Sequence, residues 1–265
     1  METTYWQIQK NNSPLYPDII WNQPENKYQT GKLLLIGGNS QSFNLVSDAY
    51  QELIKSNISE VKIILPDSLQ KFLDNKINNC YFQPSTPSGG LALLGLDSIA
   101  ELAKWSDGII LIGNFGQNSE TTILLERLIT GIKDKIITFY GDSIDHFILQ
   151  SNLLLQSPNN ILIIDIKQLQ KIFHQLKYPK TISFSMDLMN LVNILHNFSL
   201  LYNFNLITNF NDTIIVATGG KISLTKNNFI NNWQTKIAVQ AEIWSIQQPK
   251  KIFETLTTAT YIINH

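Results

Sequence analysis

The sequence predicts an α/β fold in which helices cover both faces of a mostly parallel sheet. Short apolar runs alternate repeatedly with longer amphipathic stretches. The runs place isoleucine and leucine at consecutive positions, which is typical of strands buried on both faces. The connections between them are short, which favours parallel strands joined by crossover helices. No linker, repeat or low-complexity block interrupts the chain, so we expect residues 1–265 to form a single domain.

The expected elements follow one another along the chain. Residues 1–30 contain Pro14, Pro17 and Pro24 and are expected to form an irregular arm lying on the core. The apolar runs predict five strands, at residues 32–36, 61–65, 108–112, 135–140 and 161–164. The stretches of helical period predict four helices, at residues 45–55, 97–105, 119–129 and 145–155. Ser119 is the expected N-cap of the third helix.

The last third of the chain predicts a different arrangement. A strong apolar stripe indicates a helix over residues 187–202. Short strands are expected at 206–207, 213–217 and 221–224, and the Thr218-Gly219-Gly220 sequence indicates a hairpin between the last two. Two final helices, at 235–247 and 252–263, are separated by Pro249. The sequence therefore predicts a late β-hairpin followed by two helices.

The charge balance and composition exclude several classes of protein. Lys plus Arg is 20 and Asp plus Glu is 21, so the net charge is -1 and nucleic acid is not an expected partner. No apolar run approaches the ~20 residues that span a bilayer. The N-terminus lacks the pattern of a secretory signal, and Cys80 is the only cysteine, so we expect a cytoplasmic protein. Because Arg127 is the only arginine, any bound phosphate should be held by amides, lysines or hydroxyls.

Two predicted strand ends carry glycine-rich loops. The loop at 37–43 has the sequence GGNSQSF, and the loop at 113–119 has the sequence GNFGQNS. In an open parallel sheet, ligands bind at the carboxyl ends of the strands. Glycines let the backbone approach a ligand, and the N-terminus of the following helix favours an anion. The first loop is neither a Walker A motif nor a complete G-x-G-x-x-G, and a tight turn between strand and helix is an equally good interpretation of it.

A third strand end, at residues 140–146, carries titratable groups. Asp142, Asp145 and His146 have the i, i+3, i+4 spacing of one helical face, which would suit an acid/base or metal cluster. The alternative, which we favour, is that Asp142 or Ser143 caps the next helix. The other histidines and the cysteine have no ligand spacing, so no metal held by protein side chains is expected. The polar loop at 85–90 is interpreted as a surface loop or as a mobile segment over the site.

The order of these features resembles the ADP/ATP-dependent NAD(P)H-hydrate dehydratases of the ribokinase-like superfamily. Lys27 and Gly31 match the turn that opens this family, Gly37 and Gly38 match its GGS segment, and Phe43 stands near its aromatic position. The resemblance implies a three-layer α/β/α fold with a mostly parallel sheet and a late β-hairpin. It also implies a hydrated nicotinamide side of the site, formed by Gly37, Gly38, Asn39, Ser40 and Phe43.

The second loop and the third strand end extend the resemblance. Gly113 and Gly116 match the glycines of the family's IGPGLG segment, and Asp142 matches the second acidic position of its VILDADAL segment. The resemblance implies a nucleotide side formed by Gly113, Asn114, Phe115 and Gly116. Asp142 is our candidate base, and Asp212 is the only other nearby carboxylate that could substitute for the family's base. The implied ligands are ADP or ATP with Mg²⁺ and an NAD(P)H-type dinucleotide, and a homo-oligomer is common in the family.

Three departures from the family predict lost chemistry. Residues 163–168 replace its TPHPGE segment, Asn209-Phe210 replaces its Lys-Gly pair, and Ile-Asn-Asn-Trp at 230–233 replaces its GSGD loop. In the family, the amides of that loop form an anion hole and its aspartate is the base. We therefore expect a catalytically impaired or inactive pseudoenzyme with a nucleotide- or dinucleotide-binding or assembly role. The alternatives are an active dehydratase in metabolite repair, a small-molecule kinase of the superfamily, or an unrelated α/β protein.

Overall fold

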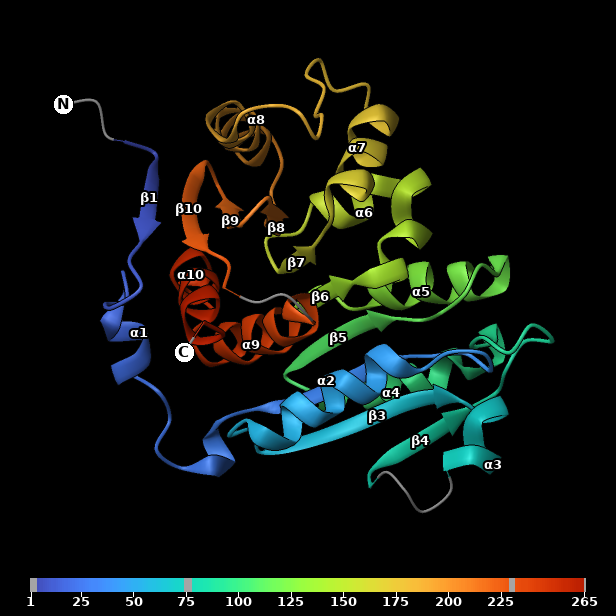
Figure 1. Cartoon of the computed structure of the whole chain (residues 1–265). Helices are drawn as coiled ribbons and strands as arrows, with labels where there is room; N and C mark the ends of the chain where they lie inside the picture. Colours follow the sequence, from blue (N-terminus) through green and yellow to red (C-terminus); the bar gives the residue numbers. More distant parts are fainter. Residues whose placement is uncertain (1–3, 74–77, 229–231, 265) are drawn as a thin grey trace.

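A single mostly parallel sheet forms the centre of the molecule. The computed structural model describes residues 4–73, 78–228 and 232–264. Within these residues the strands are β1 (Trp6–Gln9), β2 (Lys32–Gly37), β3 (Glu60–Pro66), β4 (Cys80–Gln83), β5 (Gly108–Gly113), β6 (Ile136–Tyr140), β7 (Asn160–Ile163), β8 (Asn205–Phe210), β9 (Thr213–Thr218) and β10 (Lys221–Lys226). They form one sheet in the order β1-β10-β9-β8-β7-β6-β5-β2-β3-β4 (Figure 1).

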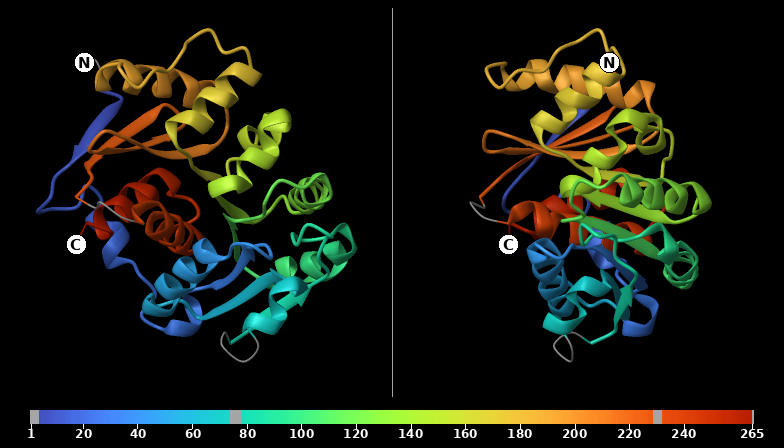
Figure 2. Two further views of the ribbon diagram at one scale, coloured as in Figure 1. Left: turned by 45° about the vertical axis from the view of Figure 1, so that its right-hand side comes forward. Right: turned by 90° about the vertical axis from the view of Figure 1, so that its right-hand side faces the viewer.

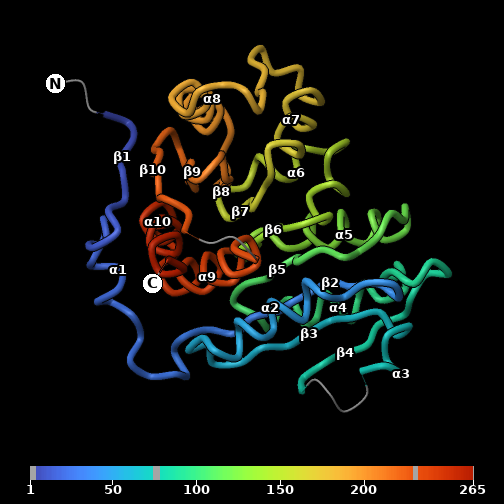
Figure 3. The backbone as a smooth tube through the Cα atoms, viewed as in Figure 1, coloured from blue at the N-terminus to red at the C-terminus, as the bar shows by residue number. Residues whose placement is uncertain are grey.

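All neighbouring strands run parallel except around β9. This strand pairs antiparallel with β8 on one side and with β10 on the other. Gly219 and Gly220, both with positive φ, form the turn between β9 and β10, so the predicted late hairpin is confirmed. β1 forms one edge of the sheet beside β10 (Figure 3). The two strands pair in parallel, with Trp6 opposite Ile222.

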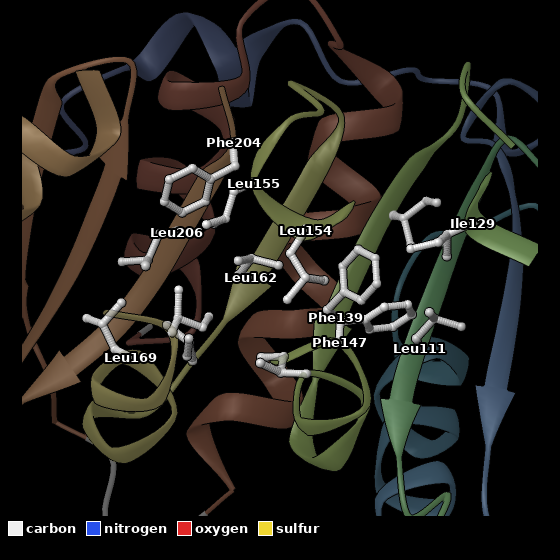
Figure 4. Close-up of a cluster of buried hydrophobic side chains, with 14 of the residues drawn as sticks. Leu111, Ile129, Phe139, Phe147, Leu154, Leu155, Leu162, Leu169, Phe204 and Leu206 are labelled. Carbon is white, nitrogen blue, oxygen red and sulfur yellow. The ribbon is translucent and has the colours of Figure 1, made fainter. Parts of the chain in front are cut away.

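One face of the sheet is covered by α4 (Leu96–Trp105), α5 (Ser119–Gly131), α6 (Ser151–Leu155), α7 (Ile166–Gln175) and α8 (Leu188–Leu201). Strand residues such as Leu34 and Ile36 point into this layer. Phe139 of β6 meets Phe147 edge to face, with ring centroids 5.5 Å apart (Figure 4). Burying this apolar surface contributes roughly 25 cal/mol per Å², which makes the layer a main source of stability.

The opposite face is covered by α1 (Pro17–Trp21), α2 (Asn44–Lys55), α3 (Gln70–Leu73), α9 (Trp233–Gln247) and α10 (Ile252–Ile262) (Figure 2). Leu33 and Leu35, the alternate residues of β2, point into this layer. Because successive strand residues point to opposite faces, the unbroken apolar runs of the sequence fill both layers. The predicted three-layer α/β/α fold is confirmed.

A fully buried carboxyl group lies beneath the centre of the sheet. Glu242 of α9 is 0 % exposed, and the Thr138 hydroxyl of β6 donates to its Oε2 at 2.6 Å. Its Oε1 has no hydrogen-bond partner among the described residues. A Cβ atom on Gly108 would lie 2.1 Å from this oxygen, so β5 has to begin with glycine. Burial raises the pKa of Glu242 well above its ordinary value, because the interior disfavours the charged form.

The sequence prediction requires several corrections. Residues 1–30 are not irregular throughout, since they contain β1 and α1. The predicted helix at 145–155 is a 3₁₀ segment, Asp145–Gln150, followed by the short helix α6. Besides β1 and α1, one further strand and two further helices were not predicted: β4, α3 and α7. In the described part of the chain, no helix combines the length and the apolar character that crossing a bilayer would require.

Candidate active site

The three strand-end loops singled out in the sequence come together at one edge of the sheet. Since β2, β5 and β6 are neighbours (Figure 3) and run parallel, their carboxyl ends lie at the same edge. The Gly38 amide donates to the Gly113 carbonyl oxygen at 3.0 Å, and Asn39 Nδ2 donates to the Asn114 carbonyl oxygen at 2.6 Å. The predicted substrate loop and the predicted nucleotide loop therefore contact each other directly.

Two of these glycines are required by the backbone. A Cβ atom on Gly37 would lie 2.6 Å from the Gly113 carbonyl oxygen, so only glycine permits this approach between β2 and β5. Gly113 has a φ of +94°, which side-chain-bearing residues rarely adopt. The glycines of both loops are thus explained by local geometry, whether or not a ligand binds there.

The amides of the second loop already bind an anion that belongs to the protein. Asp142 Oδ1 accepts from the Phe115 amide at 3.2 Å, and Asp142 Oδ2 accepts from the Gly116 amide at 3.0 Å. Consecutive amides of this kind form a cradle for a negatively charged group. A phosphate placed on these two amides would have to displace the Asp142 carboxylate. The residues present do not fit a phosphate at this position, and they occupy both oxygens of the candidate base.

Asparagine side chains cap the two helices that follow the glycine loops. Asn114, at φ +59°, accepts through Oδ1 from the Leu45 amide in the first turn of α2, at 2.9 Å. Asn118 Oδ1 accepts from the Glu120 amide at 2.8 Å and from the Thr121 amide at 3.3 Å in the first turn of α5. The prediction that Ser119 caps this helix is wrong. Side chains of the protein itself thus satisfy amides that the sequence analysis assigned to a ligand.

The first loop is closed by its own side chain. Asn39 is 9 % exposed, and its Oδ1 accepts from the Gln41 amide at 2.8 Å and from the Ser42 amide at 3.1 Å. Ser40 is exposed, while Phe43 is half-buried at the start of α2. Of the five residues predicted for the substrate side, Ser40 and Phe43 therefore present the most accessible side chains, because Gly37, Gly38 and Asn39 are buried.

The polar loop at 85–90 is hydrogen-bonded to both glycine loops. The Gly89 carbonyl oxygen accepts from the Ser40 amide at 3.0 Å and from the Ser68 hydroxyl at 3.1 Å. Ser88 Oγ accepts from Asn118 Nδ2 at 2.7 Å. The loop is therefore held by hydrogen bonds to the walls of the site.

A cavity of about 430 Å³ opens beside the second loop and is called here the His146 cavity. His146 Nδ1 lies 2.6 Å from Thr122 Oγ1, and the imidazole packs edge to face against Phe115. Burial lowers the pKa of His146, although nearby Asp142 and Asp145 partly oppose the shift. The cavity is lined by Gly116, Gln117, Asn118, Ser119, Thr122, Asp142, Asp145, His146, Leu149 and Lys171.

The cluster of Asp142, Asp145 and His146 predicted from spacing does line one cavity, but its carboxylates are engaged. Lys171 of α7 forms an ion pair with Asp145 at 2.6 Å, and Gln168 Nε2 donates to Asp145 Oδ2 at 2.9 Å. Asp142 caps no helix; it binds the loop amides described above. Among the described residues, no three His, Cys, Asp or Glu side chains are grouped as metal ligands.

Sequence reasoning missed the contribution of α7 to this cavity. Gln168 and Asp165 form a capping box at the start of α7, and the side chain of Gln168 also donates to the Gly141 carbonyl oxygen at 2.8 Å. The D-x-x-Q pattern just before an apolar stripe was the available signal for this helix. A helix beginning at this pattern would have placed Lys171 in its second turn, near the carboxyl ends of the strands. Thr122 and Ser88 had no comparable signal, because their partners lie 24 and 30 residues away.

The three segments that depart from the dehydratase pattern also meet, at a second and smaller cavity of about 250 Å³. We call it the Trp233 cavity; it is lined by Ile164, Asp165, Ile166, Lys167, Phe184, Asn209, Trp233 and Gln234. Residues 230 and 231 lie outside the described residues. Asn232 has a φ of +56°, and its Nδ2 donates to Asp48 Oδ2 of α2 at 3.2 Å. The first turn of α9 contains no acidic residue.

Comparison with known proteins defines the fold of the chain. No protein-family model matches the sequence, and no curated protein matches it. A ribokinase-like superfamily protein from Enterococcus faecalis has a similar structure, with a TM-score of 0.71 and 14% identity, over 99% of this chain and 87% of that one. The ADP/ATP-dependent NAD(P)H-hydrate dehydratase of Bacillus subtilis, co-crystallized with ATP/Mg²⁺, gives 0.63 and 10%, over 96% and 88%.

A phosphomethylpyrimidine kinase from Clostridium difficile is also similar, with a TM-score of 0.56 and 8% identity over 88% of this chain and 98% of that one. The chain thus has the three-layer fold of the ribokinase-like proteins, and its structural neighbours include both kinases and hydrate dehydratases. At these identities the likeness defines the fold alone, because one fold supports many chemistries.

Proposed function

We propose that this chain is a divergent relative of the NAD(P)H-hydrate dehydratases that binds a nucleotide or dinucleotide and has lost most or all of the ATP-dependent chemistry. The observation that carries the proposal is the beginning of α9. Trp233 and the left-handed Asn232 stand where the resemblance places the end of a glycine loop and its catalytic aspartate. Neither side chain can act as a general base at this position.

The nearest carboxylates do not replace the missing base. Asp48 accepts a hydrogen bond from Asn232, and Asp165 caps α7 through the Gln168 amide at 2.7 Å. Asp142 is held by two loop amides. Loss of a general base typically lowers the rate about 10²–10⁴-fold, before any loss of phosphate stabilisation is added. We therefore expect hydrated NADH to turn over at least about 100-fold more slowly than with an active relative.

The binding role rests on the His146 cavity. Its volume of about 430 Å³ is within the range of small-molecule pockets. Its charged groups are Asp142, Asp145 and Lys171, and the lowered pKa of His146 leaves that ring neutral at pH 7. The lining of the His146 cavity therefore carries a net charge of -1, which disfavours the binding of a phosphate group inside it. The uncharged nucleoside part of the ligand would therefore occupy the cavity beside Gly116, with its phosphates outside.

The second loop would act mainly through its shape. Gly116 lines the His146 cavity, and Gly113 and Asn114 accept hydrogen bonds from the first loop, whose Ser40 and Phe43 do not line the cavity. In this arrangement, Gly116 would contact the nucleoside. The rest of the loop, Gly113, Asn114 and Phe115, would lie behind Gly116, and none of these amides would bind phosphate. Mg²⁺ would arrive only with the ligand, since no metal-ligand group is present among the described residues.

Thermal-shift measurements with adenosine, ADP, ATP, NADH and NADPH, each with and without Mg²⁺, test the binding role. A ligand at 100 times its dissociation constant stabilises the native state by ~2.7 kcal/mol, which raises the Tm by roughly 5–10 °C for a chain of this size. We expect adenosine to give a shift that is independent of Mg²⁺. Failure of every compound in the series to shift the Tm would refute the binding role.

Three variants locate the ligand. Ser119→Phe should fill the His146 cavity and abolish the shift, while Ser119→Ala should retain it. Trp233→Ala, which enlarges the other cavity, should leave the shift unchanged. A shift that requires phosphate and disappears in Trp233→Ala would instead place the ligand at α9. Turnover of hydrated NADH with ADP or ATP, at the rate of an active relative, would refute the loss of catalysis.

One observation favours the alternative of an active enzyme, either a dehydratase or a small-molecule kinase. His146, hydrogen-bonded to Thr122 and near Asp145, provides acid/base groups inside a cavity of suitable size. This alternative predicts turnover that is lost in His146→Asn and retained in Trp233→Ala. Assembly into a homo-oligomer, the other expected role, remains a prediction that light scattering on the purified chain can test.

A further inference from the structure

A groove between α4 and α5 lies at the opposite edge of the sheet from the His146 cavity. It is reached from the loop that joins the end of α5 to the start of β6 and has a volume of about 290 Å³. The half-buried Leu96 and Ala100 belong to its lining, together with Ile132, which is 9 % exposed. We call it the Arg127 groove. Its apolar floor provides a surface on which a hydrocarbon or aromatic body can be buried.

The rim of the Arg127 groove carries the only arginine of the chain. Within the described ranges, no hydrogen bond or ion pair engages the Arg127 guanidinium, and the side chain is exposed. By contrast, Lys135 Nζ donates to the Ser106 carbonyl oxygen at 2.7 Å, so this ammonium is already engaged. Arg127 is therefore a cation with all of its donors available at the mouth of an apolar groove.

The charge of the rim favours a monoanion. Three cations and two carboxylates line the groove, a net charge of +1: Arg127, Lys104, Lys135, Asp97 and Asp134. A ligand with one negative charge neutralises this excess, whereas a dianion would leave the occupied groove with a net charge of -1. A guanidinium pairs with a carboxylate through two parallel hydrogen bonds, which an ammonium group cannot form.

We propose that the Arg127 groove binds a small amphipathic carboxylate. Its acyl or aryl body would lie on Leu96, Ala100 and Ile132, and its carboxylate would pair with the Arg127 guanidinium. The groove is separate from the site of the proposed nucleotide function, and none of its lining residues lines the His146 cavity.

Gly131 offers a way to block the groove without changing its charge. It is the last residue of α5, it lines the groove, and a Cβ atom placed on it would meet nothing within 4 Å. Its φ is not in the left-handed region. The fold can therefore accommodate a leucine at position 131. Its side chain would occupy the part of the groove in which we place the apolar body of the ligand.

Isothermal titration calorimetry of the full chain with octanoate tests the proposal, with octanamide and octyl phosphate as probes of charge. We expect octanoate to bind with a dissociation constant of about 0.1–1 mM. Octanamide and octyl phosphate should bind about tenfold or more weakly. Raising the salt concentration should weaken octanoate binding, because the pair at the rim is exposed.

Four variants complete the experiment, each checked for folding by its circular dichroism spectrum and Tm. Arg127→Met should raise the dissociation constant about tenfold or more, and Arg127→Lys should raise it by a smaller factor. Gly131→Leu should abolish binding, while Lys133→Met, an exposed cation outside the groove, should leave it unchanged. Equal affinity for octanoate and octanamide, unchanged binding in Gly131→Leu, or tighter binding of octyl phosphate would overturn the proposal. Conversion of a dimer to a monomer by Gly131→Leu would also overturn it, because a second copy would then occupy the groove.

Discussion

Replacing Glu242 by glutamine should change the way in which stability depends on pH. The carboxyl group is fully buried beneath β5 and β6, with one oxygen bonded to Thr138 and the other without a partner among the described residues. Its pKa is raised in the folded chain, so folding favours the protonated form. The contribution of Glu242 to stability is therefore fully present below the unfolded pKa of about 4.3 and is lost as the pH rises toward the folded pKa.

The slope of this loss follows from linkage. One proton separates the two states between the unfolded and folded pKa values, so the free energy of unfolding should fall by about 1.4 kcal/mol for each pH unit in that interval. Glutamine keeps the shape of the side chain and an oxygen for the Thr138 hydroxyl, but it cannot ionise. The variant should therefore lack this slope, and its stability relative to the wild type should improve as the pH rises from 5 toward the folded pKa.

Urea unfolding monitored by tryptophan fluorescence at pH 5, 6, 7 and 8 measures the effect. The difference in unfolding free energy between Glu242→Gln and the wild type is the informative quantity, because other titrating groups cancel in it. Glu101→Gln, at an exposed position of α4, is the matched control and should follow the wild-type profile. Parallel profiles for the wild type and Glu242→Gln would refute the conclusion that the buried carboxyl is protonated in the folded chain.

Three further substitutions test the strand-end loops, each by equilibrium urea unfolding. Gly37→Ala should destabilise by about 1–3 kcal/mol, because its Cβ would lie 2.6 Å from the Gly113 carbonyl oxygen; an unchanged midpoint would contradict the close approach. Asp142→Ala should cost about 1–3 kcal/mol by leaving two loop amides unpaired, whereas exposed Asp134→Ala should change stability by less than about 0.5 kcal/mol; equal effects would argue against the internal anion. Asn118→Ala should lower the free energy of unfolding by about 0.5–2 kcal/mol through the lost cap. An unchanged free energy of unfolding would contradict the role of Asn118 as the N-cap of α5.

The central part of the fold could be predicted because both faces of its strands are apolar. β2 and β5 are continuous runs of isoleucine and leucine, and burial on both faces is the usual reason for such runs. The strands β1 and β4, at the two edges of the sheet, have the sequences WQIQ and CYFQ, which mix polar and apolar residues. An edge strand has one unpaired side and less apolar surface to bury, so its sequence carries a weaker signal.

The place of the candidate site could be predicted, but its internal bonding could not. Glycine-rich strand ends and the expected parallel order were enough to bring the loops at 37–43, 113–119 and 140–146 to one edge. The partners of the amides were not visible, because Asp142 binds a loop 26 and 27 residues before it and Asn114 caps a helix 69 residues before it. Which side chain fills such a cradle depends on tertiary packing, which a local pattern does not contain.

The pairing of β1 with β10 has a consequence for the order of folding during synthesis. Trp6 lies opposite Ile222, so the first strand cannot enter the sheet until the ribosome has made almost the whole chain (Figure 3). At about 5–20 residues per second, the roughly 215 intervening residues take some 10–40 s to translate. During that time the nascent N-terminus, with Trp6 and Ile8, has no sheet partner, and chaperones that bind exposed apolar segments have their longest opportunity there. The β1 edge of the sheet can thus form only after the chain has been synthesised as far as β10.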